Sequence, residues 1–249
     1  MCGYTGFTNH IDNSNRVIED MMDQIRHRGP DAAGRYVDGD IALGHRRLSI
    51  IDITEQGDQP IYNEDRTKVL VFNGEIYNYQ DIRKDLLAAG HVFRTQTDSE
   101  VLIHGYEEYG PELLPRLRGM FSFVIWDTVK KELFGARDFF GIKPLYYAVM
   151  GESFLFGSEI KSFLVHPHFK KELNETALEN YLTFQYSPTE ETFFQERIQI
   201  AGCPLFYLRQ RQADHQALLG GQVRCGQQTP TGGLGKRDLR HFPQFRPGA

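Results

Sequence analysis

The stretch MFSFVIWDTVKKELFGAR, residues 120–137, decides the fold class. Its two apolar runs, Met120–Trp126 and Glu132–Ala136, are short, rich in aromatic or β-branched residues, and separated by a polar turn. The runs Leu145–Val149 and Phe154–Phe156, which follow, are also short and rich in aromatic or β-branched residues. Connections this short cannot carry the crossover that parallel strands need, so the four runs are predicted to pair antiparallel.

The rest of the first 194 residues alternates further strands with helices. Strands are also predicted at Cys2–Phe7, Ile41–Leu43 and Val69–Phe72. Helices are predicted at Asn78–Ala89, Asp98–Tyr109, Glu159–Leu164 and Asn174–Phe184, and one more carries Ile18, Met21, Met22 and Ile25 between the capping candidates Asn13 and Ser14 and the stop Gly29. The fold class is therefore α+β.

Composition excludes several classes of protein. The 249 residues are 40% hydrophobic and 24% charged. The sequence contains neither an apolar run of the ~18 residues that a membrane span needs nor a secretion signal. We therefore expect a cytoplasmic protein. The net charge of −5 argues against nucleic acid and anionic membranes as partners. Neither the three cysteines nor the histidines have the spacing of metal ligands, so no metal site is predicted. The histidines are expected to lie in the core or on the surface. These histidines are His27, His45, His91 and His104.

The chain changes character near residue 194. Residues 195–249 contain eight Lys/Arg and three Asp/Glu, a net of +5, which leaves −10 for residues 1–194. The second segment also has nine Gln and eight Gly and no sustained apolar period after Leu208. We therefore expect a folded domain at 1–194 and a divergent tail at 195–249, disordered or translated from a shifted reading frame.

Cys2 is the first candidate for chemistry. Removal of Met1 would give Cys2 both a thiol and a free α-amine. A thiol titrates near ~8.5 and an α-amine near ~7.7–8, so the amine can accept the thiol proton around neutral pH and the nucleophile brings its own base. The alternative is a small buried side chain at the start of a strand.

Six blocks carry a resemblance to a known family. The sequence MCGYTGF at 1–7 resembles the start of class II glutamine amidotransferases, the N-terminal-nucleophile hydrolases that release ammonia from glutamine. The other blocks follow in order: RGPD at 28–31, GHRRLSIID at 44–52, FNGEIYN at 72–78, TDSE at 97–100, and ARD at 136–138 with GIKPLYY at 141–147. Together they look like the asparagine synthetase branch. The resemblance covers residues 1 to about 194 and implies a four-layer αββα sandwich of two antiparallel sheets.

The resemblance implies roles for the residues around the nucleophile. The Asn73 side-chain amide and the Gly74 backbone N–H would form the oxyanion hole that stabilises the negative oxygen formed when Cys2 attacks. Without the other motifs, Asn-Gly after a strand is a hairpin-turn signal, and both interpretations can hold.

The far end of glutamine needs a fixed cation and a fixed anion. Arg47 can grip the α-carboxylate, with the adjacent Arg46 as the alternative, and Asp98 can pair with the α-ammonium. Asp98 lies in Thr-Asp-Ser-Glu, which also reads as a helix capping box. By resemblance, Glu75 contacts the same end of the substrate and the backbone around Ile50 lines the pocket. Five further charged residues are expected to be structural: Arg28, Asp31, Arg137, Asp138 and Lys143.

The expected activity is hydrolysis of L-glutamine to glutamate and ammonia, without a cofactor. In the family, a synthetase domain then uses ATP and Mg²⁺ to activate aspartate through a phosphate loop, S-G-G-x-D-S. That motif is missing here, since TGGLG at 231–235 lacks its acidic residue and serine. Two alternatives stay open: an amidotransferase for a different acceptor, and an inactive fragment. The oligomeric state is left open.

Overall fold

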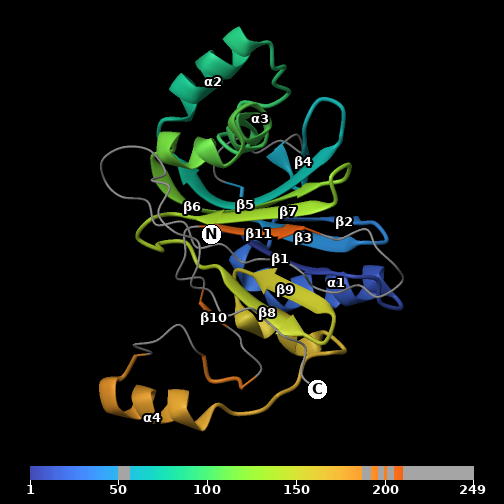
Figure 1. Ribbon diagram of the computed structural model, residues 1–249, viewed down its shortest axis with the longest axis vertical. Coiled ribbons are helices and arrows are strands. Elements are labelled where there is room, and N and C mark those ends of the chain that lie inside the picture. Colours follow the sequence, from blue (N-terminus) through green and yellow to red (C-terminus); the bar gives the residue numbers. More distant parts are fainter. Residues whose placement is uncertain (50–56, 187–191, 196–198, 201–204, 210–249) are drawn as a thin grey trace.

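A computed structural model of the chain describes residues 1–49, 57–186, 192–195, 199–200 and 205–209. Within these residues the chain forms two antiparallel sheets that face each other, with helices on both outer faces (Figure 1).

The first sheet has the strand order β10-β8-β9-β1-β3-β2. Its strands are β1 (Gly3–Thr8), β2 (Ala32–Val37), β3 (Ile41–Arg47), β8 (Tyr146–Met150), β9 (Ser153–Gly157) and β10 (Gln199–Ile200). The N-terminal strand β1 pairs with β3 on one side and with β9 on the other. The start of the chain is therefore held in the middle of a sheet rather than at an edge.

The second sheet has the order β11-β7-β6-β5-β4. Its strands are β4 (Ile61–Tyr62), β5 (Lys68–Ile76), β6 (Gly119–Asp127), β7 (Glu132–Arg137) and β11 (Leu205–Arg209). The predicted hairpin of residues 120–137 is β6 and β7, paired antiparallel. Asp127 closes its turn, because Asp127 Oδ1 accepts hydrogen bonds from the backbone N–H groups of Val129 (3.0 Å) and Lys130 (2.8 Å).

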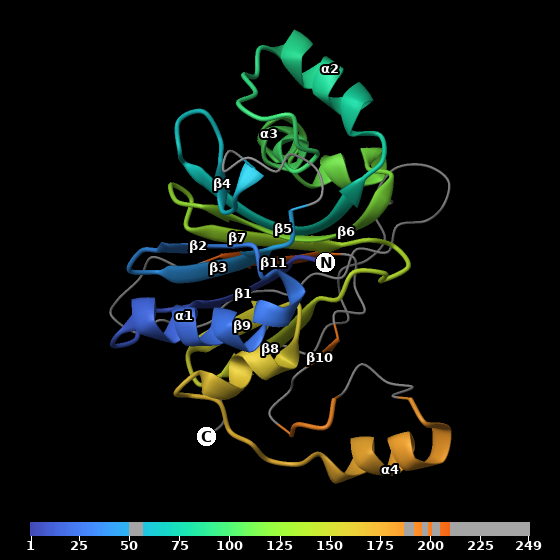
Figure 2. The same cartoon turned by 180° about the vertical axis from the view of Figure 1, so that it is seen from behind.

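Helices complete four layers, as Figures 1 and 2 show from opposite sides. The first sheet is covered by α1 (Ser14–Gln24) and the 3₁₀ segment Ile160–Val165, and the second by α2 (Tyr79–Ala89) and α3 (Glu100–Tyr109). The remaining helical segments are the 3₁₀ turns Arg26–Arg28 and Gly110–Arg116 and the helix α4 (Glu175–Phe184). The predicted αββα sandwich of class α+β is confirmed.

Strand alternation assigns each side chain to one of the core layers. In β5, Val69 and Val71 pack in the core between the two sheets, whereas Leu70 and Phe72 pack in the core under α2 and α3. The central strands are therefore apolar on both faces, which is why β5, β6 and β7 read as continuous apolar runs in the sequence.

Several boundaries differ from the predictions. The predicted helix Glu159–Leu164 is a 3₁₀ segment one residue later, and β2 and β4 were not predicted. Strand β2 escapes detection because it is a half-exposed edge strand built from small and polar residues. The prediction of no packed fold after residue 194 misses β10 and β11, which pair with β8 and β7. Residues 210–249 lie outside the described residues.

Candidate active site

Cys2 lies immediately before β1 and is half-buried. The Leu48 backbone N–H donates a hydrogen bond to Cys2 Sγ (3.4 Å), and the thiol is 3.6 Å from the Leu48 carbonyl oxygen that accepts from it. Both polar backbone groups of Leu48, the residue directly after β3, therefore contact the Cys2 sulfur.

Arg28 fixes the backbone of Cys2. Arg28 Nε donates to the Cys2 carbonyl oxygen (2.9 Å), and Arg28 Nη1 pairs with Glu159 (3.0 Å). A side chain on Gly3 would come within 2.7 Å of Arg28 Cδ, so the glycine after the nucleophile leaves room for this arginine. Arg28 thus has the structural role expected for it.

The two adjacent arginines point to opposite faces of the first sheet. Ile41 and Leu43 of β3 face the core between the sheets, so strand alternation places Arg47 on that face and Arg46 on the other. Arg46 donates to the Met22 carbonyl oxygen on α1 and pairs with Asp23. The buried Arg47 pairs instead with Asp58 (2.6 Å). Of the two candidates, only Arg47 lies on the face of the first sheet that is turned towards the second sheet.

Asn73 lies inside β5 and not in a hairpin turn. It is opposite Ser122 of β6, so the hairpin interpretation of Asn-Gly is wrong; tertiary pairing overrides the local turn preference. Asn73 is 2% exposed and follows Val69 and Val71 on the face between the sheets. Among the described residues, Asn73 Nδ2 has no hydrogen-bond partner. A buried amide donor of this kind is costly unless a ligand or water accepts from it.

The Gly74 backbone N–H faces the edge of β5 that lies away from β6. Tyr77 N donates to the Arg118 carbonyl oxygen at the end of β6, so odd-numbered amides of β5 face β6 and even-numbered amides face the other edge. On that other edge, Gln59 Oε1 accepts from Phe72 N (2.6 Å) and Asp98 Oδ2 accepts from Ile76 N (2.8 Å). The Gly74 amide lies between these two anchored positions.

Only glycine fits at position 74. A Cβ there would come within 2.3 Å of the Met120 carbonyl oxygen and 2.7 Å of Phe121 Cα. Both atoms belong to the neighbouring backbone of β6, which cannot move aside as a flexible side chain can. The close packing of the two strands therefore excludes any side chain beside Asn73.

Asp98 is buried next to the same edge. Desolvation by burial raises its pKa to about 6, with a smaller upward effect from the charge of Glu75, while the bond from Ile76 N lowers it. The capping-box interpretation is wrong, because α3 begins at Glu100 without a side-chain cap and the Glu100 carboxylate accepts from Thr95 N (2.8 Å). The exposed Glu75 lies one residue beyond Gly74 on β5.

Arg47 and the segment before Asp98 converge at Gly57. A Cβ on Gly57 would lie 2.4 Å from Arg47 Nη2 and 3.3 Å from Thr97 Cγ2. Arg47 and Thr97, the residue directly before the predicted anion Asp98, thus both lie beside Gly57. Ile50, the remaining predicted pocket residue, lies outside the described residues.

Three residues that support the site were not predicted as part of it. Asp58 pairs with Arg47, and Gln59 bonds both Phe72 N and, through Nε2, the Phe72 carbonyl oxygen (3.1 Å). His45 Nε2 also donates to that oxygen (3.0 Å), and burial lowers the pKa of His45 to about 4, so the ring is neutral at pH 7. These residue types are common, and only the folded arrangement places Asp58 beside Arg47 and both Gln59 and His45 beside Phe72.

The charged residues after β7 bind backbone, as expected. Asp138 accepts from the N–H groups of Ile142 (2.8 Å) and Lys143 (2.9 Å), and Arg137 Nε donates to the Lys143 carbonyl oxygen (2.7 Å). Asp31 accepts from the Ser49 N–H (2.8 Å), which anchors the chain just after β3. These charges shape loops.

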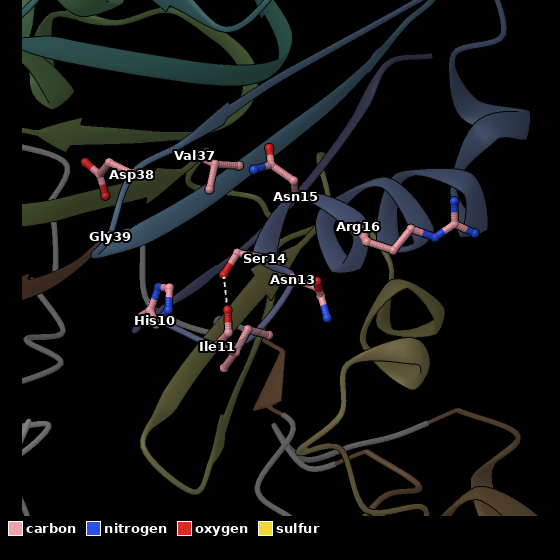
Figure 3. A pocket seen from close by; sticks show the side chains of 9 residues that line it. All are labelled: His10, Ile11, Asn13, Ser14, Asn15, Arg16, Val37, Asp38 and Gly39. Atoms are coloured by element: carbon pink, nitrogen blue, oxygen red, sulfur yellow. Dashed lines mark hydrogen bonds between the residues drawn. The ribbon is translucent and has the colours of Figure 1, made fainter.

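A separate cavity of about 450 Å³ opens at the start of α1, between His10 and Ser14 and the β2–β3 turn around Asp38 (Figure 3). None of the predicted site residues lines it. No helix among the described residues has the length and apolar character needed to cross a bilayer.

Comparison with known proteins places the chain in a family. A family model described as a glutamine amidotransferase domain matches residues 1–217. Asparagine synthetase [glutamine-hydrolyzing] 1 of Bacillus subtilis is 44% identical over 197 residues, which cover 77% of this chain and 31% of that protein. Asparagine synthetase [glutamine-hydrolyzing] 2 of Arabidopsis thaliana is 47% identical over 167 residues, 65% of this chain and 28% of its own. The chain thus spans less than a third of the length of these relatives.

Solved structures share the fold. The glutamine phosphoribosylpyrophosphate amidotransferase of B. subtilis, complexed with ADP and GMP, superposes with a TM-score of 0.57 at 23% identity, covering 66% of this chain and 43% of that one. At this identity the likeness concerns the fold alone. Because the family model spans most of the sequence and curated relatives match at more than 40% identity, the chain belongs to the glutamine amidotransferase domain family.

Proposed function

We propose that this chain hydrolyses the side-chain amide of L-glutamine to glutamate and ammonia, with Cys2 as the nucleophile. One observation carries the proposal: Asn73 Nδ2 is buried on the face between the sheets and has no partner among the described residues. Cys2 is two residues before Tyr4, so the extended chain places both side chains on the same face of the sheet, and Tyr4 packs in the core between the sheets. Cys2 and the unpartnered amide donor of Asn73 thus both face the layer between the two sheets.

Activation of Cys2 requires that Met1 be removed. With Met1 in place the nitrogen of Cys2 belongs to a peptide bond and cannot act as a base. After removal, the free α-amine accepts the thiol proton, and the Leu48 N–H stabilises the resulting thiolate. Arg28 keeps the carbonyl of Cys2 fixed, so the new terminus is held while it reacts.

The thiolate then attacks the amide carbon and forms a tetrahedral intermediate. We assign its negative oxygen to Asn73 Nδ2 and the Gly74 N–H, each of which can contribute roughly 2.7–4 kcal/mol. The proton taken by the α-amine passes to the leaving nitrogen, and ammonia departs. Water, activated by the same amine, hydrolyses the γ-glutamyl thioester to glutamate and restores the thiol.

Recognition of free glutamine is assigned to charges beyond the oxyanion hole. Arg47 would grip the α-carboxylate through its planar fork, and Asp98 would pair with the α-ammonium when ionised. Asp58 neutralises Arg47 in the absence of that carboxylate. Glu75 is assigned to the amino-acid end of the site as well, whereas Ile50, expected there by resemblance, lies outside the described residues.

The names of the relatives suggest the use of the ammonia. We propose that it serves asparagine synthesis, with ATP and Mg²⁺ acting in a synthetase domain. The described residues contain no glycine-rich phosphate loop at the start of a helix, so they do not fit ATP, and no step of glutamine hydrolysis passes through it.

A glutaminase assay tests the proposal. Intact mass first establishes that Met1 is absent from the purified full chain. Glutamate release from glutamine should then fall to background in Cys2→Ala, while Cys203→Ala, a matched loss of one thiol, should keep full activity. Trimmed, folded chain without glutaminase activity would refute the proposal and favour an inactive fragment. Activity that survives Cys2→Ala would refute the assignment of Cys2 as the nucleophile.

A further inference from the structure

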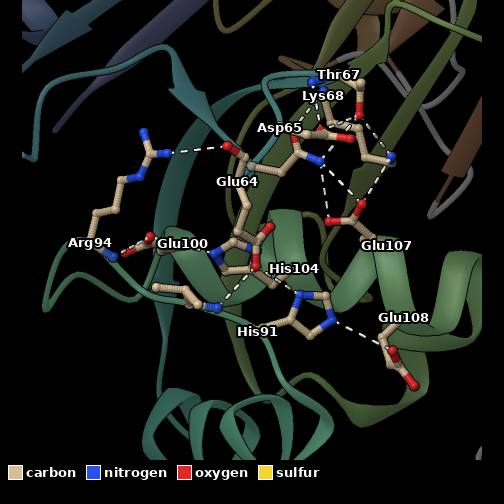
Figure 4. A network of polar contacts seen from close by, with 12 residues as sticks. Glu64, Asp65, Thr67, Lys68, His91, Arg94, Glu100, His104, Glu107 and Glu108 are labelled. Atoms are coloured by element: carbon tan, nitrogen blue, oxygen red, sulfur yellow. Dashed lines mark hydrogen bonds and ion pairs between the residues drawn. The ribbon is translucent and has the colours of Figure 1, made fainter.

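A second cluster of reactive side chains lies under the loop between α2 and α3 (Figure 4). Glu64 comes from the turn between β4 and β5, His91 from the α2–α3 loop, and His104 and Glu107 from α3. One ligand atom from each of the four residues lies within 4.8 Å of all the others. The sequence analysis did not predict this cluster, because its members come from three segments that are far apart in the sequence.

His104 is the centre of the cluster and is 1% exposed. Its Nε2 lies 3.4 Å from Glu100 Oε1, and its Nδ1 lies 3.2 Å from Glu64 Oε2. A neutral imidazole carries one proton and can donate to only one of them.

The Nε2 side of the ring faces Glu100. Glu100 is itself fixed, since it also accepts from Arg94 N (2.7 Å) and Thr95 N (2.8 Å). Among the described residues, His104 Nδ1 has no hydrogen-bond partner, although it points at Glu64. A buried ring nitrogen without a hydrogen-bond partner thus faces a carboxylate oxygen, and a cation bound between them would satisfy both.

His91 repeats the arrangement on the other oxygen of Glu64. Its Nδ1 is 3.1 Å from Glu64 Oε1, and its Nε2 is 3.5 Å from Glu108 Oε2. The two imidazole rings lie side by side with centroids 5.2 Å apart. Nδ1 of His91 and Nδ1 of His104 therefore both face the Glu64 carboxylate. The other nitrogen of each ring faces a second carboxylate, Glu108 for His91 and Glu100 for His104.

We propose that Glu64, His91, His104 and Glu107 bind one divalent transition-metal ion, of which Zn²⁺ fits the donor set best. Imidazole nitrogen and carboxylate oxygen are ligands that zinc takes in tetrahedral sites, with bonds of about 2.0–2.2 Å. Such ligands are about 3.3 Å apart, so the present spread closes by small side-chain movements. The Glu100–His104 contact is the carboxylate–histidine pair that orients metal ligands.

Metal at this position ties three segments together. It links the β4–β5 turn and the α2–α3 loop to α3, whose first turn follows Asp98. Because binding requires the folded arrangement, zinc stabilises the chain against unfolding, and the gain in free energy of unfolding rises with the logarithm of the zinc concentration above the dissociation constant. The role is structural and stands apart from amide hydrolysis, so it does not depend on the proposed function.

Zinc titration of the full chain in a Cys2→Ala, Cys203→Ala, Cys225→Ala background tests the site without competing thiols. Calorimetry on protein stripped with EDTA should give one Zn²⁺ per chain, and the melting temperature should rise with zinc. His91→Ala and Glu107→Gln, which change partly exposed positions, should each weaken binding by at least about 10-fold. His10→Ala, an exposed histidine outside the cluster, is the matched control and should bind as the parent does.

Cobalt(II) reports the ligands directly. Its visible spectrum should show tetrahedral nitrogen and oxygen ligation, and the intensity should fall in His91→Ala. No zinc uptake by folded protein, or uptake unchanged by both cluster variants, would overturn the proposal. Glutaminase activity in the wild-type background should persist in the cluster variants, so failure here is distinguishable from failure of the proposed function.

Discussion

Asp98→Asn should stabilise the chain while impairing use of glutamine. The carboxyl is 7% exposed, and its pKa is raised from 3.8 to about 6, mainly by burial. Ionised Asp98 therefore costs the folded state about 3 kcal/mol at neutral pH relative to the unfolded chain. Asparagine keeps an oxygen that can accept from Ile76 N but has no charge to bury.

The sign of the pH dependence follows from the raised pKa. Below pH 3.8 the carboxyl is protonated in both states and contributes nothing. Between pH 3.8 and about 6 the folded state retains the proton longer, so wild-type stability falls as the pH rises. The stability gained by Asp98→Asn should therefore be small at pH 4 and approach about 3 kcal/mol above pH 7.

Urea unfolding from pH 4 to 8 and steady-state kinetics measure the two effects. Wild-type KM for glutamine should rise as the pH falls below about 6, because protonated Asp98 cannot pair with the α-ammonium. The Asp98→Asn variant should have a raised KM whose pH profile shows no inflection near pH 6. Asp81→Asn, an exposed carboxylate on α2, is the control. A constant stability difference across this pH range would refute the assignment of burial as the cause.

Three further substitutions test the neighbouring positions. Asn73→Ala should lower kcat by roughly 10²–10³ with little change in KM, because the lost donor acts on the transition state, and pre-steady-state kinetics should place the loss in thioester formation. Gly74→Ala should destabilise the fold by about 1–3 kcal/mol or more in chemical unfolding, since its Cβ would lie 2.3 Å from the Met120 carbonyl oxygen; wild-type stability would contradict the packing described. Arg47→Lys should raise KM by roughly 10-fold or more at similar kcat, because an ammonium cannot donate two parallel bonds to a carboxylate, whereas Arg46→Lys should leave KM unchanged.

The sequence by itself determined the fold class and most of the central strands. Runs such as Met120–Trp126 are apolar on both faces because both faces of the sheet are covered, and such runs are visible without coordinates. The blocks around Cys2 and Asn73 also pointed to the family that the comparisons show. Edge strands such as β2 were missed, since a half-exposed strand needs no apolar run.

Only the tertiary structure decided how the candidate residues are used. The resemblance favoured Arg47 over Arg46, but which face of β3 each arginine occupies depends on how β3 meets the second sheet. The sequence could not show that Asn73 lies within a strand, because pairing with β6 overrides the local turn preference of Asn-Gly. The His91 and His104 cluster is likewise formed by packing alone, since no local spacing brings residues from a loop and a helix onto one carboxylate.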